Sequence, residues 1–245
     1  MLFIRKVTLI VLILTLISNV PIHAAENEYD VPILMYHSID EYKGYGYKEH
    51  FVHPKNFKAQ MEYLKSERFT PITFDDIPNL ENIKKPIIIT LDDGYKNSLN
   101  AYNILKALND SSFQAKATIF MLGRKIDTKG GLSRGQLKEM SDSGIISVQS
   151  HTETHPDLTE TPYYITELSD IKTKLEEITG KNITALAYPS GIYNDKVIEE
   201  ARKYYQYAVT TKPGIANTSD SLYEMKRVRI NNSTTLSAFI KLVNP

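Results

Sequence analysis

The chain has 245 residues, and its 29 Lys and Arg side chains balance its 29 Asp and Glu side chains, so the formal net charge is zero. This balance argues against nucleic acid as the main partner. The absence of cysteine excludes disulfides, thiolate zinc sites and thiol nucleophiles. A hydrophobic fraction of 42% with 24% charged residues is typical of a globular protein, and the length suits one or two domains.

Residues 1–25 have the pattern of a targeting segment. Arg5 and Lys6 precede an apolar run over residues 7–20, and small residues follow up to Ala24 and Ala25. This order is typical of a cleaved secretory signal peptide, and the run is short for a transmembrane helix, which needs about 20 residues. An uncleaved signal anchor is the alternative. We therefore expect a secreted or cell-wall associated protein that meets the membrane only through this segment, if the segment is not cleaved.

Short apolar segments rich in β-branched residues alternate with helical patterns along residues 26–245, which we expect to form one domain. The predicted strands are residues 31–36, 86–92, 116–121, 145–150, 183–188, 207–211 and 226–230. The predicted helices are residues 54–69, 97–109, 134–144, 161–180 and 196–205. This alternation predicts an α/β fold with a parallel sheet, and seven or eight such units favour a single distorted (β/α) barrel.

Polar clusters follow two of the predicted strands. Asp92, Asp93 and Gly94 end the strand over 86–92, while His151 and His155 follow the strand over 145–150. Active sites of α/β barrels form at the carboxyl ends of the strands, so the two clusters are expected on one rim. Two imidazoles with one carboxylate form a ligand set for a divalent metal ion, and a second carboxylate can take a proton from water.

Each cluster alone also has a structural interpretation. Asp-Asp-Gly is common in turns, where Asp caps the turn and Gly adopts a positive φ, and two histidines four residues apart can both face solvent. Their occurrence together, after matching strands, favours a metal site. Non-haem iron oxygenases use the same ligand set, but their chemistry gives no role to the extra Asp92 and no reason for export.

Three segments resemble the motifs of the polysaccharide deacetylases, carbohydrate esterase family 4. They are TLDDGY (90–95), SHTETHPDL (150–158) and AYPSGIYND (187–195), and the similarity extends over about residues 31–235. The resemblance implies a distorted (β/α) barrel that removes acetyl groups from N-acetylated sugars with a divalent metal ion. Zn²⁺ is the ion we expect, with Co²⁺, Ni²⁺ and Mn²⁺ as alternatives.

Carried over motif by motif, the resemblance assigns a role to each matching residue. It makes Asp92 the general base and Asp93, His151 and His155 the metal ligands. The backbone N–H of Ser190 would help to hold the oxyanion. Tyr188 and Tyr95, which belong to the same motifs, would lie with Ser190 beside the substrate.

The general acid is expected outside the usual family position. No histidine follows His155, so the usual C-terminal catalytic histidine is absent. Residues 31–39 (VPILMYHSI) instead resemble the N-terminal motif of a permuted subgroup that includes poly-N-acetylglucosamine deacetylases, in which His37 would be the general acid. A buried His37 bonded to the backbone is the alternative. His50 and His53 flank a loose stretch rich in Tyr and Gly and receive no role.

Two further departures concern the third motif. Its common arginine is absent, and we expect Arg227 to replace it in orienting Asp92, because strand alternation would point Arg227 and Arg229 inward. A surface arginine at a strand edge is the alternative. Ser190 stands where the family usually has tyrosine, which removes an aromatic ring from beside the substrate.

The resemblance therefore predicts that residues 26–245 are the catalytic domain of a polysaccharide N-deacetylase. We expect a monomer that releases acetate from peptidoglycan, poly-N-acetylglucosamine or a chitin-like polymer and does not bind nucleic acid. The altered third motif and the absence of Trp support a second interpretation, a catalytically weak or inactive wall-glycan-binding protein on the same scaffold.

Overall fold

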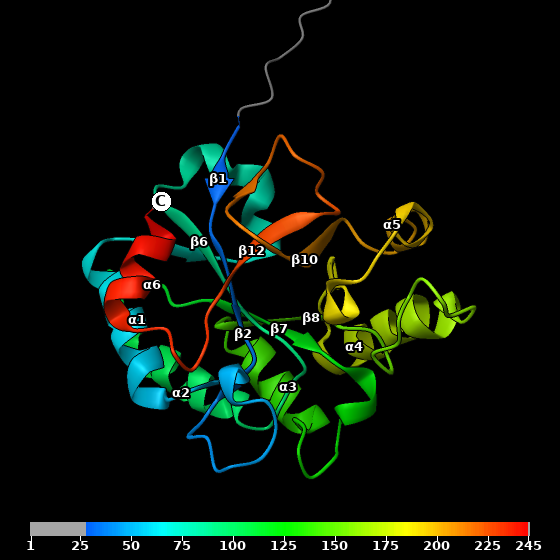
Figure 1. Cartoon of the computed structure of the whole chain (residues 1–245), viewed down its shortest axis with the longest axis horizontal. Coiled ribbons are helices and arrows are strands. Elements are labelled where there is room, and N and C mark those ends of the chain that lie inside the picture. The colour runs from blue at the N-terminus through cyan, green and yellow to red at the C-terminus, as the bar shows by residue number, and fades with distance from the viewer. Residues whose placement is uncertain (1–27, 245) are drawn as a thin grey trace, which may run out of the picture.

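The computed structural model describes residues 28–244, so the predicted signal peptide lies outside the described residues. Seven parallel strands form a closed barrel in the order β2-β12-β10-β9-β8-β7-β6, and the pairing of β2 with β6 closes the ring (Figure 1). These strands are β2 (Ile33–Tyr36), β6 (Pro86–Leu91), β7 (Ala117–Met121), β8 (Ile146–Ser150), β9 (Ala185–Ala187), β10 (Tyr207–Pro213) and β12 (Met225–Arg229). The expected single barrel is thereby confirmed.

The barrel is distorted in two places. β8 and β9 pair only at Ser150 and Leu186, and the register between β10 and β12 shifts between Val209 and Pro213. Each of the seven strands was predicted within about three residues of its observed bounds. An eighth strand, β5 (Thr70–Ile72), was not predicted and pairs with the first three residues of β6.

Besides β5, four short strands of the described residues lie outside the ring. The predicted strand over residues 31–36 is split at Pro32, which has no N–H to donate. The residues before Pro32 form β1 (Asp30–Val31), which pairs antiparallel with β11 (Ala216–Asn217). β3 (Ser38–Ile39) pairs with β4 (Phe51–Val52), so the Tyr- and Gly-rich stretch between them is held at both ends.

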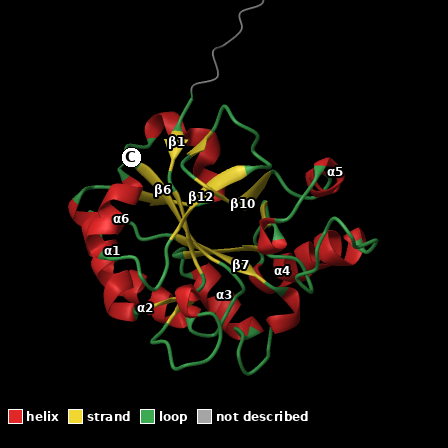
Figure 2. Ribbon diagram, viewed as in Figure 1, coloured by secondary structure: helices red, strands yellow, loops and turns green. Residues whose placement is uncertain are grey.

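In the described part of the chain, six α-helices surround the barrel (Figure 2). They are α1 (Pro54–Ser66), α2 (Ser98–Leu108), α3 (Arg134–Asp142), α4 (Ile171–Thr179), α5 (Asp195–Arg202) and α6 (Leu236–Val243). Ser133 caps α3 as its sequence indicates, because its side chain accepts from the Gln136 N–H. The helix expected from residue 161 instead begins as a π-helical turn over Ile165–Asp170, and α6 was not predicted. Within residues 28–244, no helix combines the length and the apolar character needed to cross a membrane.

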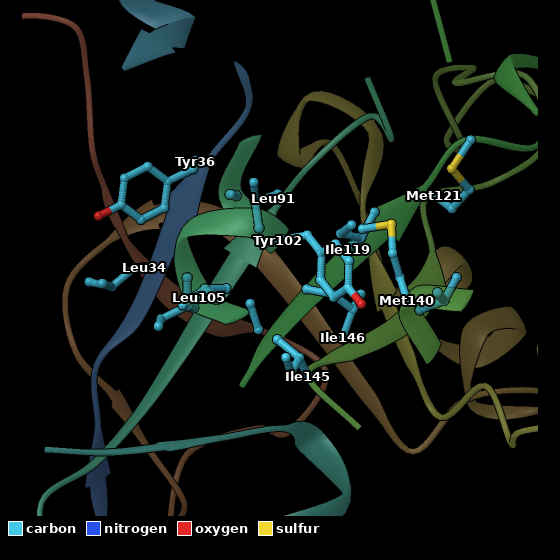
Figure 3. Close-up of a cluster of buried hydrophobic side chains, with 14 of the residues drawn as sticks. Leu34, Tyr36, Leu91, Tyr102, Leu105, Ile119, Met121, Met140, Ile145 and Ile146 are labelled. Atoms are coloured by element: carbon cyan, nitrogen blue, oxygen red, sulfur yellow. The ribbon is translucent and has the colours of Figure 1, made fainter. Parts of the chain in front are cut away.

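The apolar core has two parts, on the two faces of the ring. The larger part lies between the strands and the helices, where Leu34 and Leu91 of the strands pack with Tyr102 and Leu105 of α2 (Figure 3). The smaller part fills the barrel and includes Ile88 of β6. Successive residues of a strand point to opposite faces, so the pleat alone decides which residues enter the barrel.

This alternation places the site. On β6, Ile88 lies in the inner cluster while Ile89 and Leu91 lie in the outer one, so Thr90 and Asp92 point inward. On β2, Tyr36 lies in the outer cluster, so the next residue, His37, points inward. On β12, the outward residues are Val228 and Ile230, and the inward ones are Arg227 and Arg229, as predicted. These assignments on β6, β2 and β12 all follow from one rule, the alternation of side chains along a strand.

Candidate active site

Asp93, His151 and His155 form a cluster at the carboxyl end of the barrel. Their ligand atoms all lie within 4.8 Å of one another. His151 Nδ1 lies 2.7 Å from the Ala187 carbonyl oxygen, and this hydrogen bond leaves Nε2 facing Asp93, 3.7 Å from its Oδ1. A backbone acceptor on one ring nitrogen is the usual support of a metal-binding histidine. Two imidazoles and one carboxylate in this arrangement fit a divalent ion such as Zn²⁺.

Strained backbone marks the same region. Asp93, Thr152, His155 and Ser190 have φ values of 73°, 68°, 63° and 55°, in the left-handed region that residues with side chains rarely adopt. Gly94 also has a positive φ, and a Cβ there would lie 2.1 Å from Met121 Sδ, so this turn requires glycine. Such strain persists where the surroundings impose it, commonly at functional sites. The Asp-Asp-Gly segment is thus both a turn and part of the cluster.

Asp92 and Arg227 form a buried, two-pronged ion pair. The guanidinium nitrogens lie 2.7 and 2.8 Å from the two carboxylate oxygens, and Nε donates to the Thr210 carbonyl at 2.8 Å. The two residues are only 2% and 1% exposed, which excludes the alternative of a surface arginine. Burial raises the pKa of Asp92, but the charge and hydrogen bonds of Arg227 outweigh it and hold that pKa well below its usual range. Asp92 is therefore a carboxylate at neutral pH.

His37 lies in the same cavity, and its ring stacks on that of His50. The ring centroids are 3.9 Å apart and the planes are within 9° of parallel. Burial lowers the pKa of His37 to about 4, although the Asp92 carboxylate pulls it upward. Burial and the charge of Arg229 also lower the pKa of His50. Sequence reasoning gave His50 no role because it follows a Tyr- and Gly-rich stretch, but the β3–β4 pairing brings it over His37.

The other expected residues line one cavity of about 430 Å³ with these groups. Tyr95 hydrogen-bonds Asp93, and burial together with the Asp93 charge raises the pKa of Tyr95 to about 12. Burial raises the pKa of Tyr188, whose ring stacks on Tyr193 at 4.9 Å. The lining residues include His37, Asp92, Asp93, Tyr95, His151, His155, Tyr188 and Ser190. All expected site residues thus meet at this cavity. Arg227 does not line the cavity itself but contacts Asp92, which does.

Three basic side chains in the cavity received no role from the sequence. Arg124 and Lys125 follow the carboxyl end of β7, and Arg229 ends β12. The rule that strand ends carry the site could have found the first two, since β7 lies between β6 and β8. A larger hollow of about 510 Å³ near the starts of β7 and β8 contains no such cluster, and its Asp76 and Lys116 pair with each other at 3.0 Å.

Comparisons with known proteins identify the family of the chain. The family model described as Polysaccharide deacetylase matches residues 79–209. YxkH of Bacillus subtilis (strain 168), described as a candidate polysaccharide deacetylase, is 37% identical over 218 residues, which are 85% of this chain and 74% of YxkH. A poly-β-1,6-N-acetyl-D-glucosamine N-deacetylase of Staphylococcus epidermidis is 26% identical and covers 76% of this chain and 70% of its own length.

A solved structure also matches closely. BA0330 of Bacillus anthracis, again described as a candidate polysaccharide deacetylase, is 48% identical with a TM-score of 0.87 over 88% of this chain and 69% of its own. The chain belongs to the polysaccharide deacetylase family. The expected class of enzyme, a hydrolase of amide bonds, is thereby confirmed, as is the expected family. Family membership also favours hydrolysis over the oxygenase chemistry that the ligand set alone left open.

Proposed function

We propose that the chain is a metal-dependent N-deacetylase of N-acetylglucosamine units in a cell-wall or extracellular polysaccharide. The observation that carries this proposal is the single cavity that holds Asp93, His151 and His155 beside the carboxylate of Asp92 and the ring of His37. A ligand cluster, a base and an acid are the groups that hydrolysis of an unreactive amide requires. The poly-N-acetylglucosamine N-deacetylase among the relatives supports this substrate class.

Each residue of the site would have one role in the reaction. Asp93, His151 and His155 would hold a divalent ion, for which we propose Zn²⁺ because this ion is commonly bound by imidazole. Such an ion, when bound, polarises a carbonyl and makes water more acidic. Asp92 takes a proton from the attacking water, and Arg227 keeps both oxygens of Asp92 in place. The Ser190 N–H donates to the oxyanion of the tetrahedral intermediate. Tyr95 and Tyr188 border the sugar.

His37 gives its proton to the departing sugar nitrogen, because an amine leaves only when protonated. With a pKa of about 4, the ring is neutral in the resting protein at pH 7, so it must first take up a proton from water and then pass it to the sugar nitrogen. The charge of Asp92 is the largest influence that favours this protonation. Within residues 28–244 the His37 ring forms no hydrogen bond to the backbone, which leaves it free to meet the substrate.

Acetate release tests the proposal directly. The purified protein is incubated with peptidoglycan, poly-N-acetylglucosamine and chitin oligomers, after treatment with a chelator and after Zn²⁺, Co²⁺, Ni²⁺ or Mn²⁺ is restored. We expect acetate from at least one polymer and a loss of activity on chelation that one of these ions reverses. Full activity in the chelated protein would contradict metal dependence.

The altered third motif supports a second candidate, a wall-glycan-binding protein without activity. Ser190 replaces the usual aromatic residue, but any residue other than proline supplies the backbone N–H that the oxyanion needs. Binding of a polymer without acetate release, in the presence of each metal ion, would favour this candidate over the enzyme.

The place of action is part of the proposal. The signal-like pattern of residues 1–25 supports export, followed by association with the wall or release. An N-acetylated polysaccharide of the wall or matrix lies outside the membrane, so export would bring the enzyme to its substrate.

A further inference from the structure

The charges that line the catalytic cavity do not balance. Asp92 and Asp93 are the only acidic side chains among its lining residues, against Arg124, Lys125 and Arg229. Asp92 is neutralised by Arg227, and Asp93 belongs to the ligand cluster. Three basic side chains therefore face the cavity and form no ion pair with an acidic side chain that lines it, although Lys125 lies near enough to Asp93 to sense its charge.

These three side chains differ from other basic residues near the rim. Lys174 pairs with Glu153 at 2.6 Å and Lys212 with Glu224 at 3.3 Å. No ion pair of Arg124, Lys125 or Arg229 forms within residues 28–244. Lys125 instead lies over the Tyr95 ring, 3.2 Å from its centroid. Lys125 and Arg229 are partly buried, and a desolvated cation without a counter-ion is costly unless a ligand supplies the negative charge.

The basic residues stand on two sides of the site. Arg124 and Lys125 follow β7, whereas Arg229 ends β12, and in the ring β2 and β6 separate these strands on one side and β10, β9 and β8 on the other. A chain of sugars lying across the cavity would therefore meet a cation on either side of the reacting unit.

We propose that the substrate is an anionic glycan, with a phosphate or carboxylate group close to the N-acetylated sugar that reacts. Arg124 and Lys125 on one wall, and Arg229 on the other, bind this group. The inference rests on the proposed function and names the substrate class of the same site. Phosphate and carboxylate share the chemistry that arginine recognises, since both accept two parallel N–H donors.

The positive charge of the deacetylated product is consistent with an anionic substrate. Deacetylation turns a neutral acetamide into an amine that is cationic at neutral pH. A neutral polymer would thus leave the cavity with a charge that its three basic residues repel. A polymer with phosphate or carboxylate groups keeps an attraction to these residues before and after the reaction.

Matched oligomers test the inference. One pentamer of N-acetylglucosamine is neutral, a second carries one phosphate monoester, and a third carries one carboxylate in place of a primary alcohol. For each, dissociation constants and kcat/KM for acetate release are measured with the full chain between 0.05 and ~0.5 M NaCl, a range over which screening shortens markedly. We expect a charged oligomer to bind roughly tenfold more tightly than the neutral one at low salt, with a smaller difference at high salt.

Variants identify the residues responsible. Arg124→Gln with Lys125→Gln, and separately Arg229→Gln, should lower the preference for the charged oligomer several-fold. Lys129→Gln is the matched control, because Lys129 is exposed on the same loop, does not line the cavity and carries the same charge. It should leave the preference unchanged. Thermal unfolding of each variant shows whether it is folded.

The two charged oligomers show which anion the cavity selects, and either preference supports the inference. Equal binding of the neutral and both charged oligomers by the wild-type chain would overturn it. A preference that persists in both the double variant and Arg229→Gln would also overturn it. If no oligomer releases acetate while the charged preference and its loss in the variants are observed, the proposed reaction fails and the anionic site stands.

Discussion

At the scale of single residues, two adjacent aspartates with different surroundings divide the work of the site. Asp92 is buried against Arg227, and Asp93 turns through a left-handed backbone toward His151 and His155. The sequence predicts that both matter, since they follow an apolar strand. Which of the two would meet the metal ion follows from the turn after β6, because the left-handed backbone of Asp93 directs it to the two histidines.

This division predicts different losses for two isosteric substitutions. Asp92→Asn should keep its metal ion and lower kcat by about 10²- to 10⁴-fold, because only the proton acceptor is lost. Asp93→Asn should lose metal affinity and activity together. Metal content and acetate release, measured on the same preparations, check both. Loss of metal from Asp92→Asn with retention in Asp93→Asn would reverse the two roles.

The role of His37 predicts a dependence on the leaving group. His37→Ala should retain its metal ion and lower kcat on an N-acetylated oligosaccharide by about 10²- to 10⁴-fold. The loss should be much smaller on an activated aryl acetate, whose leaving group departs without a proton. Steady-state rates on the two substrates provide the comparison. Equal losses on both would show that His37 is not the acid.

At the scale of elements, the turn after β6 fixes where Asp93 points. Gly94 follows Asp93 with a φ of 65°, and Met121 of β7 fills the space where a side chain would be. The predicted strand ended correctly near Asp92, and the turn chemistry was also foreseen. The close approach of β7 to this turn was not predicted. A helix separates β6 and β7 in the chain, and neither strand's sequence shows that the two strands pair.

Gly94→Ala should therefore damage both the fold and the metal site. The new methyl group would meet Met121 Sδ at 2.1 Å, and overpacking of this kind costs about 1–3 kcal/mol. Urea unfolding and metal content measure the two effects. The control is Gly130→Ala, where no atom lies within 4 Å of the added Cβ, and a change below about 0.5 kcal/mol is expected. Equal behaviour of the two variants would contradict the importance of this contact.

At the scale of the whole molecule, the Asp92–Arg227 pair joins β6 to β12 across the barrel, between residues 135 apart in sequence. β2 lies between these two strands in the ring and pairs with both, so the ion pair depends on the placement of β6 and β12 on either side of β2. The ion pair thus connects the arrangement of the barrel strands to the position of Asp92. Its contribution to stability also depends on pH.

Arg227→Met should lower the free energy of unfolding at pH 7 by about 3–5 kcal/mol, because it leaves a charge buried without its partner. In the wild type the pKa of Asp92 is depressed, so the pair's stabilisation is present above the unfolded value of ~3.9 and is lost as pH falls through the folded pKa. In the variant, burial raises that pKa, so protonation relieves the strain. The gap between the two proteins should shrink from pH 7 to pH 4.

Denaturant unfolding at several pH values measures this gap. The double variant Asp92→Asn with Arg227→Met removes both charges and should recover part of the stability that Arg227→Met loses. A gap that is constant with pH, with no recovery in the double variant, would show that lost packing rather than the unpaired charge causes the effect.

Export is also a property of the whole chain. We expect the native protein to begin near Ala25 or Glu26 and to occur at the wall or in the medium, because residues 1–25 have the order of a cleaved signal. Amino-terminal sequencing of the native protein and fractionation of the cells measure this. An intact amino terminus in the membrane fraction would favour the signal anchor.

The sequence by itself determined the strands of the barrel, the inward face of β12 and the metal-ligand candidates. These features depend on local patterns: apolar runs, a period of two and polar residues at strand ends. Only the tertiary structure placed His50 on His37 and three basic residues around one cavity, and it decided between the expected contact of Arg227 with Asp92 and a surface arginine. Such contacts join residues far apart in sequence, and closure of the ring by β2 and β6 decides which of them meet.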